Sequence, residues 1–357
     1  MDPVAQRFRT QRLSGSPLPS AEAAVRLLGA VQAQDYSGAK WSLGQRMSAA
    51  TDAAIDRELD QGRILRTHVL RPTWHFVARD DIRWMLEQSA PRVLAQSAYY
   101  FRRLDLDAGV FRRTHEIFER ELAGARHRTR AELAAALRRR RIEASGQRLA
   151  YIVAEAELTG VVCSGALRGK QHTYALLEER APGVRRLAPD EALAELTRRF
   201  FEGHGPATLR HCAWWGGLTL GEARRGIEMA GTALRQVDVG RVAHWMGRDA
   251  PAPPARDRAA YLIPEYDEAL LGYKEAALPD LPRAPGMERR RAAWVRPIVI
   301  RGGRAGTWRR TTDRSEVLLE TDVLARLDSA EEREVDKAAQ RLGRFLGKPV
   351  RLMRARR

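Results

Sequence analysis

The stretch ILRTHVLRPTWHFVA, residues 64–78, decides the fold of the first part of the chain. Arg71 and Pro72 separate two short runs of β-forming residues, and the second run, TWHFV, has the aromatic and β-branched content of a strand. We therefore predict a β-hairpin here. His68 and His75 fall within it, and we expect hydrogen-bonded structural roles for both in preference to catalytic ones.

Three helical segments precede this hairpin. In SAEAAVRLLGAVQAQ, residues 20–34, apolar residues recur at three- and four-residue spacing after the capping residue Ser20, which predicts an amphipathic helix that ends at Gln32. Two further helices are predicted at residues 39–47 and 51–63. Three helices followed by a hairpin are typical of a winged helix.

The same order of elements recurs downstream, although the residues differ. Residues 127–142 carry a capping box formed by Thr129 and Glu132, and a further helix and two β-like runs follow. We therefore predict an α+β, mostly helical fold with three tandem winged-helix domains. Their predicted boundaries are residues 1–120, 121–189 and 190–357.

The composition indicates a partner with negative charge. Lys and Arg number 62, and Asp and Glu number 45, which gives a formal net charge of +17. This charge attracts nucleic acid or an anionic membrane without showing which is bound, and arginine-rich coding would produce the same bias. Since no apolar run reaches about 18 residues and no signal-peptide core is present, we expect a soluble, nucleoid-associated protein of the cytoplasm without membrane attachment.

Two arginine-rich stretches are candidates for contact with DNA. WVRPIVIRGGRAGTWRR, residues 294–310, predicts a hairpin around Gly302 and Gly303, and an exposed ribbon of this kind fits a DNA groove. A solvated hairpin without a partner is the competing interpretation. The arginines at residues 138–141 either contact phosphate or complement a helix dipole. The predicted DNA-binding residues are Arg71, His75, Arg138, Arg139, Arg296, Arg301, Arg304 and Arg309.

The sequence lacks the motifs of several common classes of enzyme. A phosphate-binding loop, metal-ligand spacing of Cys or His, and G-x-S-x-G are all missing, so we expect no cofactor, no metal and no covalent nucleophile. Cys163 and Cys212 indicate a reducing compartment. PEYDE, residues 264–268, groups three carboxylates without the second cluster that a two-metal site needs, and we interpret it as a polar turn.

The closely spaced pair Gln32 and Gln34 needs a separate explanation. Residues two apart on a helix point about 200° from each other, so both amides face one spot only if the chain has left helical geometry by Gln34. On spacing alone, the pair is more typical of solvated polar residues at a helix end.

Four motifs in order change that interpretation: VQAQD, LRPTWHFV, YLIPEYDEALLGYKE and GRAGTWRR. Together with the predicted winged helices, they resemble the winged-helix DNA glycosylases of the AlkZ and YcaQ type over nearly the whole chain. The family's catalytic motif is glutamine, a small or apolar residue, then glutamine or aspartate. Gln32, Ala33 and Gln34 match the double-glutamine version of the AlkZ branch, whose members protect antibiotic producers from their own alkylating products.

The resemblance implies a C-shaped basic surface for duplex DNA and a monofunctional glycosylase that removes bulky or cross-linked N7-alkylguanine, for self-resistance or repair. Alkylation at N7 makes the base cationic, so the base leaves as a neutral molecule and no strong base is needed. Gln32 and Gln34 then hold a water in line with the anomeric carbon of the sugar. We expect no obligate protein partner.

Two other classes of protein stay open on the residues alone. A non-catalytic winged-helix transcription regulator would bind undamaged DNA with sequence selectivity, and each mismatch would cost about 1–3 kcal/mol. An RNA-binding module fits less well, because no RNP-type aromatic strand or G-x-x-G clamp lies in a suitable context.

Overall fold

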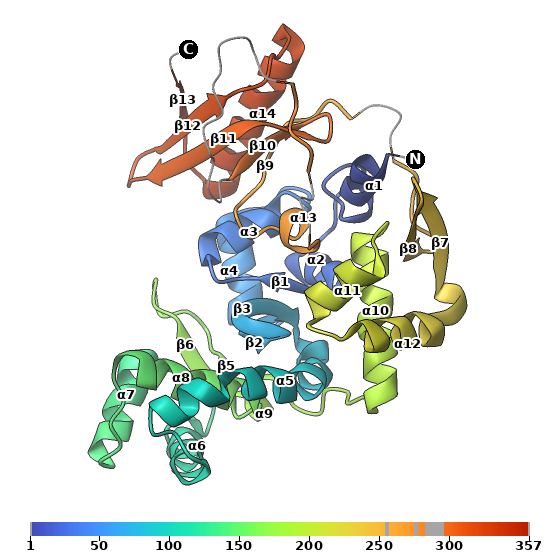
Figure 1. Ribbon diagram of the computed structural model, residues 1–357. Helices are drawn as coiled ribbons and strands as arrows, with labels where there is room; N and C mark the ends of the chain where they lie inside the picture. The colour runs from blue at the N-terminus through green and yellow to red at the C-terminus, as the bar shows by residue number, and fades with distance from the viewer. Residues whose placement is uncertain (1, 254–256, 275–277, 283–295, 356–357) are drawn as a thin grey trace.

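The hairpin at residues 64–78 forms as predicted in the computed structural model, which describes residues 2–253, 257–274, 278–282 and 296–355 (Figure 1). Strands β2 (Ile64–Val69) and β3 (Arg71–Ala78) pair antiparallel. The predicted turn is wrong by one residue, because Leu70 takes the left-handed φ of 62° and Arg71 is already part of β3. A strand, rather than a turn, therefore fixes the position of the Arg71 side chain.

The helix predicted to end at Gln32 ends four residues earlier. Helix α2 (Ala21–Leu28) is capped by the Ser20 hydroxyl, and it stops at Gly29, whose φ is 77°. The chain then runs extended as β1 (Ala30–Gln32) and pairs with β3. The apolar periodicity continues past Gly29. However, a glycine with positive φ ends a helix, and the residues that follow pair with the free edge of β3 as a strand.

The rest of the first part follows the predicted order. Its three strands form one sheet in the order β1-β3-β2. Its remaining helices are α1 (Pro3–Thr10), α3 (Tyr36–Gly44), α4 (Asp52–Asp60), the short η1 (Arg79–Asp81) and α5 (Ile82–Arg103). Helices α3 and α4 match the predicted segments.

A second group of helices has its own apolar cluster, which includes residues from Leu106 to Tyr174. The predicted capping box is confirmed, since the Thr129 hydroxyl accepts from the Glu132 N–H and the Glu132 carboxylate accepts from the Thr129 N–H. The elements are α6 (Ala108–Leu122), β4 (Arg128–Thr129), α7 (Arg130–Arg139), α8 (Gly146–Leu158), β5 (Val162–Ser164), β6 (Thr173–Leu176) and α9 (Leu177–Arg180). The cluster begins upstream of residue 121, and the division into three domains stays a prediction.

The third group contains a helix, a turn and a helix, and Thr219 caps the later helix. Its helices are α10 (Pro189–His204), α11 (Leu209–Gly216), α12 (Leu220–Ala230) and the short η2 (Gly231–Ala233). A hairpin that we did not predict, β7 (Leu234–Val239) and β8 (Val242–Gly247), packs against α10. The proline-rich connector at residues 249–257 lies partly outside the described residues.

The hairpin predicted at residues 294–310 is not an isolated ribbon. Its strands β10 and β11 lie inside a five-stranded sheet of order β13-β12-β11-β10-β9, and β10 is buried throughout. The two neighbours of this hairpin are β9, which precedes it in the sequence, and β12, which follows it. The start of the predicted hairpin lies outside the described residues. The elements are β9 (Tyr261–Leu262), α13 (Glu268–Leu271), β10 (Pro297–Ile300), β11 (Gly303–Thr312), β12 (Val317–Val323), α14 (Ser329–Leu346) and β13 (Val350–Arg354).

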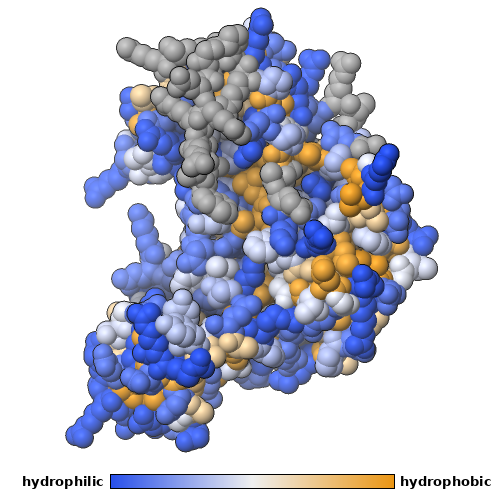
Figure 2. All heavy atoms as spheres, in the orientation of Figure 1, coloured by the Kyte–Doolittle hydropathy of each residue, from blue (hydrophilic) through white to orange (hydrophobic). Residues whose placement is uncertain are grey.

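These parts surround β1, which lies near the middle of the molecule (Figure 1). Ala30 belongs to the apolar core shared by α5 and α10, whereas Val31 belongs to the core that joins α2 to α14 and the five-stranded sheet. The five-stranded sheet and the α6–α8 group lie at opposite ends of one side, and Figure 2 shows the surface hollowed between them. Among the described residues, no helix combines the length and apolarity that crossing a membrane requires.

Candidate active site around Gln32

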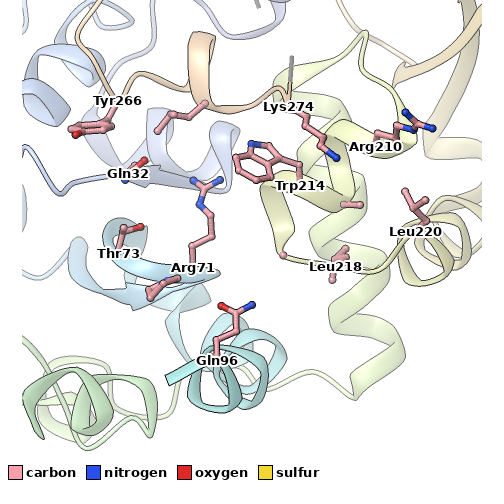
Figure 3. Close-up of a pocket in the computed structure, with 14 residues that line it drawn as sticks. Gln32, Arg71, Thr73, Gln96, Arg210, Trp214, Leu218, Leu220, Tyr266 and Lys274 are labelled. Carbon is pink, nitrogen blue, oxygen red and sulfur yellow. The ribbon is translucent and has the colours of Figure 1, made fainter. Parts of the chain in front are cut away.

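Gln32 lines an open pocket of about 950 Å³ (Figure 3). The side chains around the pocket come from β1, β3, α5, α11 and α12 and from the segment that contains α13. They include Gln32, Arg71, Arg210, Trp214, Tyr266 and Lys274. Segments that are far apart in sequence therefore meet at the end of the first strand, where the first predicted catalytic residue lies.

The backbone of Gln32 is fixed while its amide is not. The Gln32 N–H donates to Oε1 of Glu268 at 3.1 Å. Gln32 is only 8% exposed, and its side-chain amide makes no hydrogen bond with the residues that the structure describes. An amide carries both a donor and an acceptor, so this side chain retains its capacity to bind a water or a substrate in the pocket.

Both backbone polar groups of Ala33 form hydrogen bonds. Its N–H donates to the Trp74 carbonyl at 2.7 Å, and its carbonyl accepts from Nε of Arg66 at 3.1 Å. The Arg66 guanidinium also lies over the Trp74 ring at 4.3 Å. The peptide between the two glutamines is thus fixed by the β2–β3 hairpin.

Gln34 is exposed and lies past the end of β1, next to Asp35, which caps α3. An extended chain points residues two apart to the same face, which a helix does not do. Even so, Gln34 is not among the described residues that line the pocket, so the two amides do not both line it. Gln32 lies in the pocket, whereas Gln34 is exposed on the surface.

Glu268 is a residue of this site that our sequence analysis missed. It is fully buried, accepts a hydrogen bond from Nε1 of Trp215 at 2.8 Å and lies 3.3 Å from Nε2 of His204. Burial favours the neutral acid, but the hydrogen bond with His204 and the positive charge of Arg71 lower the pKa of Glu268 to about 2. A buried anion therefore lies directly behind the backbone of Gln32.

The interpretation of PEYDE as a polar turn holds for Glu265 and Tyr266, which form a turn, but not for Asp267 and Glu268, which are buried. Asp267 accepts hydrogen bonds from Arg46 at 2.7 and 2.9 Å, and both side chains of this ion pair are completely buried. Arg46 and Asp267 are 221 positions apart in the sequence, which hid the pairing. The apolar residues on both sides of the motif were the available signal, because they indicate a segment that enters a core.

Arg71 and His75 form a pair on β3. The Nδ1 of His75 is 2.9 Å from the Thr73 carbonyl, so this nitrogen carries the proton, and Nε2 accepts from Arg71 at 3.3 Å. Burial, and then the charge of Arg71, lower the pKa of His75 to about 3, so the ring is neutral. Full burial leaves His75 no surface for the predicted direct contact with DNA, whereas Arg71 lines the pocket.

The predicted arginines of the C-terminal sheet are engaged within the chain. Arg301 pairs with Glu331 at 3.0 Å and Arg304 with Asp280 at 2.8 Å. The other such pairs are Arg296 with Asp35, Arg309 with Glu320 and, on α7, Arg139 with Glu121. The neighbouring Arg138 is exposed at the end of α7. Contact with phosphate at the paired positions has to compete with a carboxylate.

Comparison with known proteins gives consistent results. A family model described as DNA glycosylase AlkZ-like matches residues 25–345. A protein of Streptomyces sahachiroi named interstrand DNA cross-link repair glycosylase is 27% identical over 325 residues, which are 85% of this chain and 86% of that protein. The solved structure of the Streptomyces sahachiroi DNA glycosylase AlkZ has a TM-score of 0.75, covers 98% of both chains and is 22% identical.

Proposed function

Because the chain belongs to the AlkZ-like family of DNA glycosylases, we propose that Gln32 positions the water that hydrolyses the N-glycosidic bond of a bulky or cross-linked N7-alkylguanine. Membership of this family sets aside the alternative of a non-catalytic regulator. The family model spans both the predicted glutamine motif and the PEYDE segment.

The observation that carries the proposal is the state of the Gln32 amide. It lines the pocket without a hydrogen bond to the described residues, while its backbone is fixed by Glu268. The amide oxygen accepts a hydrogen bond from water and its NH2 group donates, which holds a water in one orientation toward the sugar. Because an amide is not a general base, the bond it helps to break must already be weak, as it is for a cationic base.

Glu268 acts as a positioning residue and as a fixed negative charge. It is fully buried, so it does not touch the substrate, and a pKa of about 2 makes it a poor proton acceptor. As the glycosidic bond breaks, positive charge develops on the sugar near Gln32. A preorganised anion behind the strand stabilises that charge without having to reorganise.

Gln34 supplies the second amide of this proposal. Its side chain is exposed, and the hydrogen bonds of Ala33 fix the backbone between it and Gln32. The two glutamines differ in burial, so we expect Gln32 to set the orientation of the water and Gln34 to add to it when DNA covers the site. Their separate substitution distinguishes these contributions.

Bulky and cross-linked adducts suit the open shape of the pocket. It has room for more than a base, and we expect duplex DNA to approach along the hollow between the five-stranded sheet and the α6–α8 group (Figure 2). Arg71, Arg210 and Lys274 line the pocket and attract the phosphate backbone. The related Streptomyces sahachiroi protein is named for cross-link repair, which supports the same substrate here.

Base release from defined duplexes tests this function. One duplex carries a single N7-methylguanine, a second a bulky N7-alkylguanine, and a third an interstrand cross-link through guanine N7. We expect abasic sites, detected by alkaline strand cleavage, to form above the spontaneous rate, and the cross-link to be unhooked. Release of the methylated base alone would restrict the substrate to small adducts, and release from none would contradict the proposal.

A further inference from the structure

Two large apolar side chains are exposed at the wall of the pocket that contains Gln32 (Figure 3). Trp214 is 47% exposed and Leu220 is 48% exposed. Exposed apolar groups gathered at a concave site, rather than scattered over the surface, mark a place where a ligand binds. We call Trp214, Leu218 and Leu220 the apolar shelf.

The helix that carries Trp214 also fixes the catalytic strand. On α11, the adjacent Trp215 is buried and donates from Nε1 to Glu268, which in turn accepts from the Gln32 N–H. The start of α11 is capped by Thr208. The indole of Trp214 is therefore mounted on a rigid element whose position relative to Gln32 is set by a chain of hydrogen bonds.

The size of the pocket exceeds what a base needs. Its volume of about 950 Å³ is at the upper end of the range of roughly 300–1,000 Å³ that sites for drug-sized molecules occupy. Gln32 and Arg71 provide polar groups at one part of the wall, whereas the apolar shelf offers mainly carbon surface and the indole N–H, with Arg210 and Lys274 on the same side of the pocket (Figure 3). The wall is thus divided between a part suited to the sugar and base and a part suited to an apolar substituent.

We propose that the apolar shelf binds a flat aromatic arm of the adduct, stacked on the Trp214 ring while the base lies near Gln32. This inference rests on the proposed function and specifies its substrate class. An indole face favours a planar π system through stacking, and Leu218 and Leu220, which line the same pocket, supply further apolar contact. The arm would remain attached to N7 of the departing guanine.

The test uses three duplexes with one N7-alkylguanine each, bearing a methyl, a cyclohexylmethyl or an anthracenylmethyl group. Single-turnover release is measured for the wild type, Trp214→Ala, Trp214→Phe and the control Tyr99→Ala, an exposed aromatic residue on α5. We expect Trp214→Ala to lower the ratio of anthracenylmethyl to methyl release by roughly tenfold, the scale of one stacking interaction. Trp214→Phe should retain most of that ratio, and Tyr99→Ala should leave it unchanged.

Other outcomes overturn the inference. The ratio compares two rates on one preparation, so partial misfolding of a variant does not change it. An equal loss on all three duplexes would assign Trp214 to general DNA contact, and an equal loss on the cyclohexylmethyl and anthracenylmethyl duplexes would exclude stacking.

A binding experiment distinguishes failure of the proposed function from failure of this inference. If the wild type releases no base, binding is measured on duplexes whose adducted sugar carries a 2′-fluorine in the arabino configuration, which resists hydrolysis. Tighter binding of the anthracenylmethyl duplex than of the methyl duplex, lost in Trp214→Ala, would support the shelf without catalysis. Equal affinities would overturn it.

Discussion

The carboxylate of Glu268 accepts a 3.1 Å hydrogen bond from the backbone N–H of Gln32, across 236 positions of sequence. The same carboxylate accepts from Trp215 and lies beside His204. The strand that carries Gln32, the proposed catalytic residue, the helix that carries the exposed Trp214 and helix α10 therefore meet at one buried charge. The geometry of the pocket depends on this point.

Glu268→Gln is expected to destabilise the protein by about 3 kcal/mol, the scale for removing one partner of a buried, hydrogen-bonded charge. The amide has one acceptor oxygen in place of two, and its NH2 group must face a donor. Urea unfolding measures the loss. Glu265→Gln, in the same segment but half-buried, is the control and should change the stability by less than about 1 kcal/mol.

The ion pair of Arg46 and Asp267 is expected to show strong coupling in a double-mutant cycle. Both side chains are fully buried, so each single truncation leaves a buried charge and should cost about 3–5 kcal/mol. The double mutant should cost much less than the sum. The exposed pair of Arg309 and Glu320 is the comparison, with an expected coupling below about 1 kcal/mol. Equal coupling in both pairs would contradict the assignment.

The stability of the protein is expected to rise with pH because of His75. The pKa of this residue is about 3 when folded, against an ordinary value of 6.5, so between these two values the unfolded chain holds one more proton. Going from pH 7 to pH 5 should therefore cost about 2 kcal/mol through this residue. His75→Asn, which retains a donor for the Thr73 carbonyl, should show a smaller pH dependence of unfolding by that amount. An unchanged pH dependence would argue against a buried neutral ring.

The proposed DNA contacts of Arg301 and Arg304 are tested by the salt dependence of binding. If each contacts one phosphate, Arg301→Ala and Arg304→Ala should each reduce the slope of log K against log salt by about 0.9. Their partners, Glu331 and Asp280, compete for the guanidinium groups. Unchanged affinity and slope in both variants would mean that these arginines serve only the fold.

Local signals were predicted well from the sequence, and contacts between distant segments were not. The capping residue Thr129 and the hairpin at residues 64–78 depend on neighbours a few positions away. The strand β1 was mistaken for the end of a helix because its pairing partner, β3, lies more than 40 residues later. Gly29, between α2 and β1, was the local signal that the helix ends there.

In the candidate site, too, a local motif was recognised from the sequence, whereas contacts between distant segments were not. Gln32 was found because a short motif resembles a known family, and its place in a pocket agrees with that resemblance. Glu268 was missed, since its burial depends on Trp215, His204 and a strand from the other end of the chain. The C-terminal arginines were assigned to an exposed ribbon because the strands that flank it could not be placed from local pattern alone.

The proposed role of Gln32 is tested by single-turnover release of a bulky N7-alkylguanine, measured at equal DNA occupancy. Wild type, Gln32→Ala and Gln34→Ala are compared, with Gln88→Ala on α5 as a control away from the pocket. We expect a loss of about 100-fold or more in Gln32→Ala, the scale for removing a group that orients the reaction, a smaller loss in Gln34→Ala and none in the control. Release by Gln32→Ala at the wild-type rate would contradict this role.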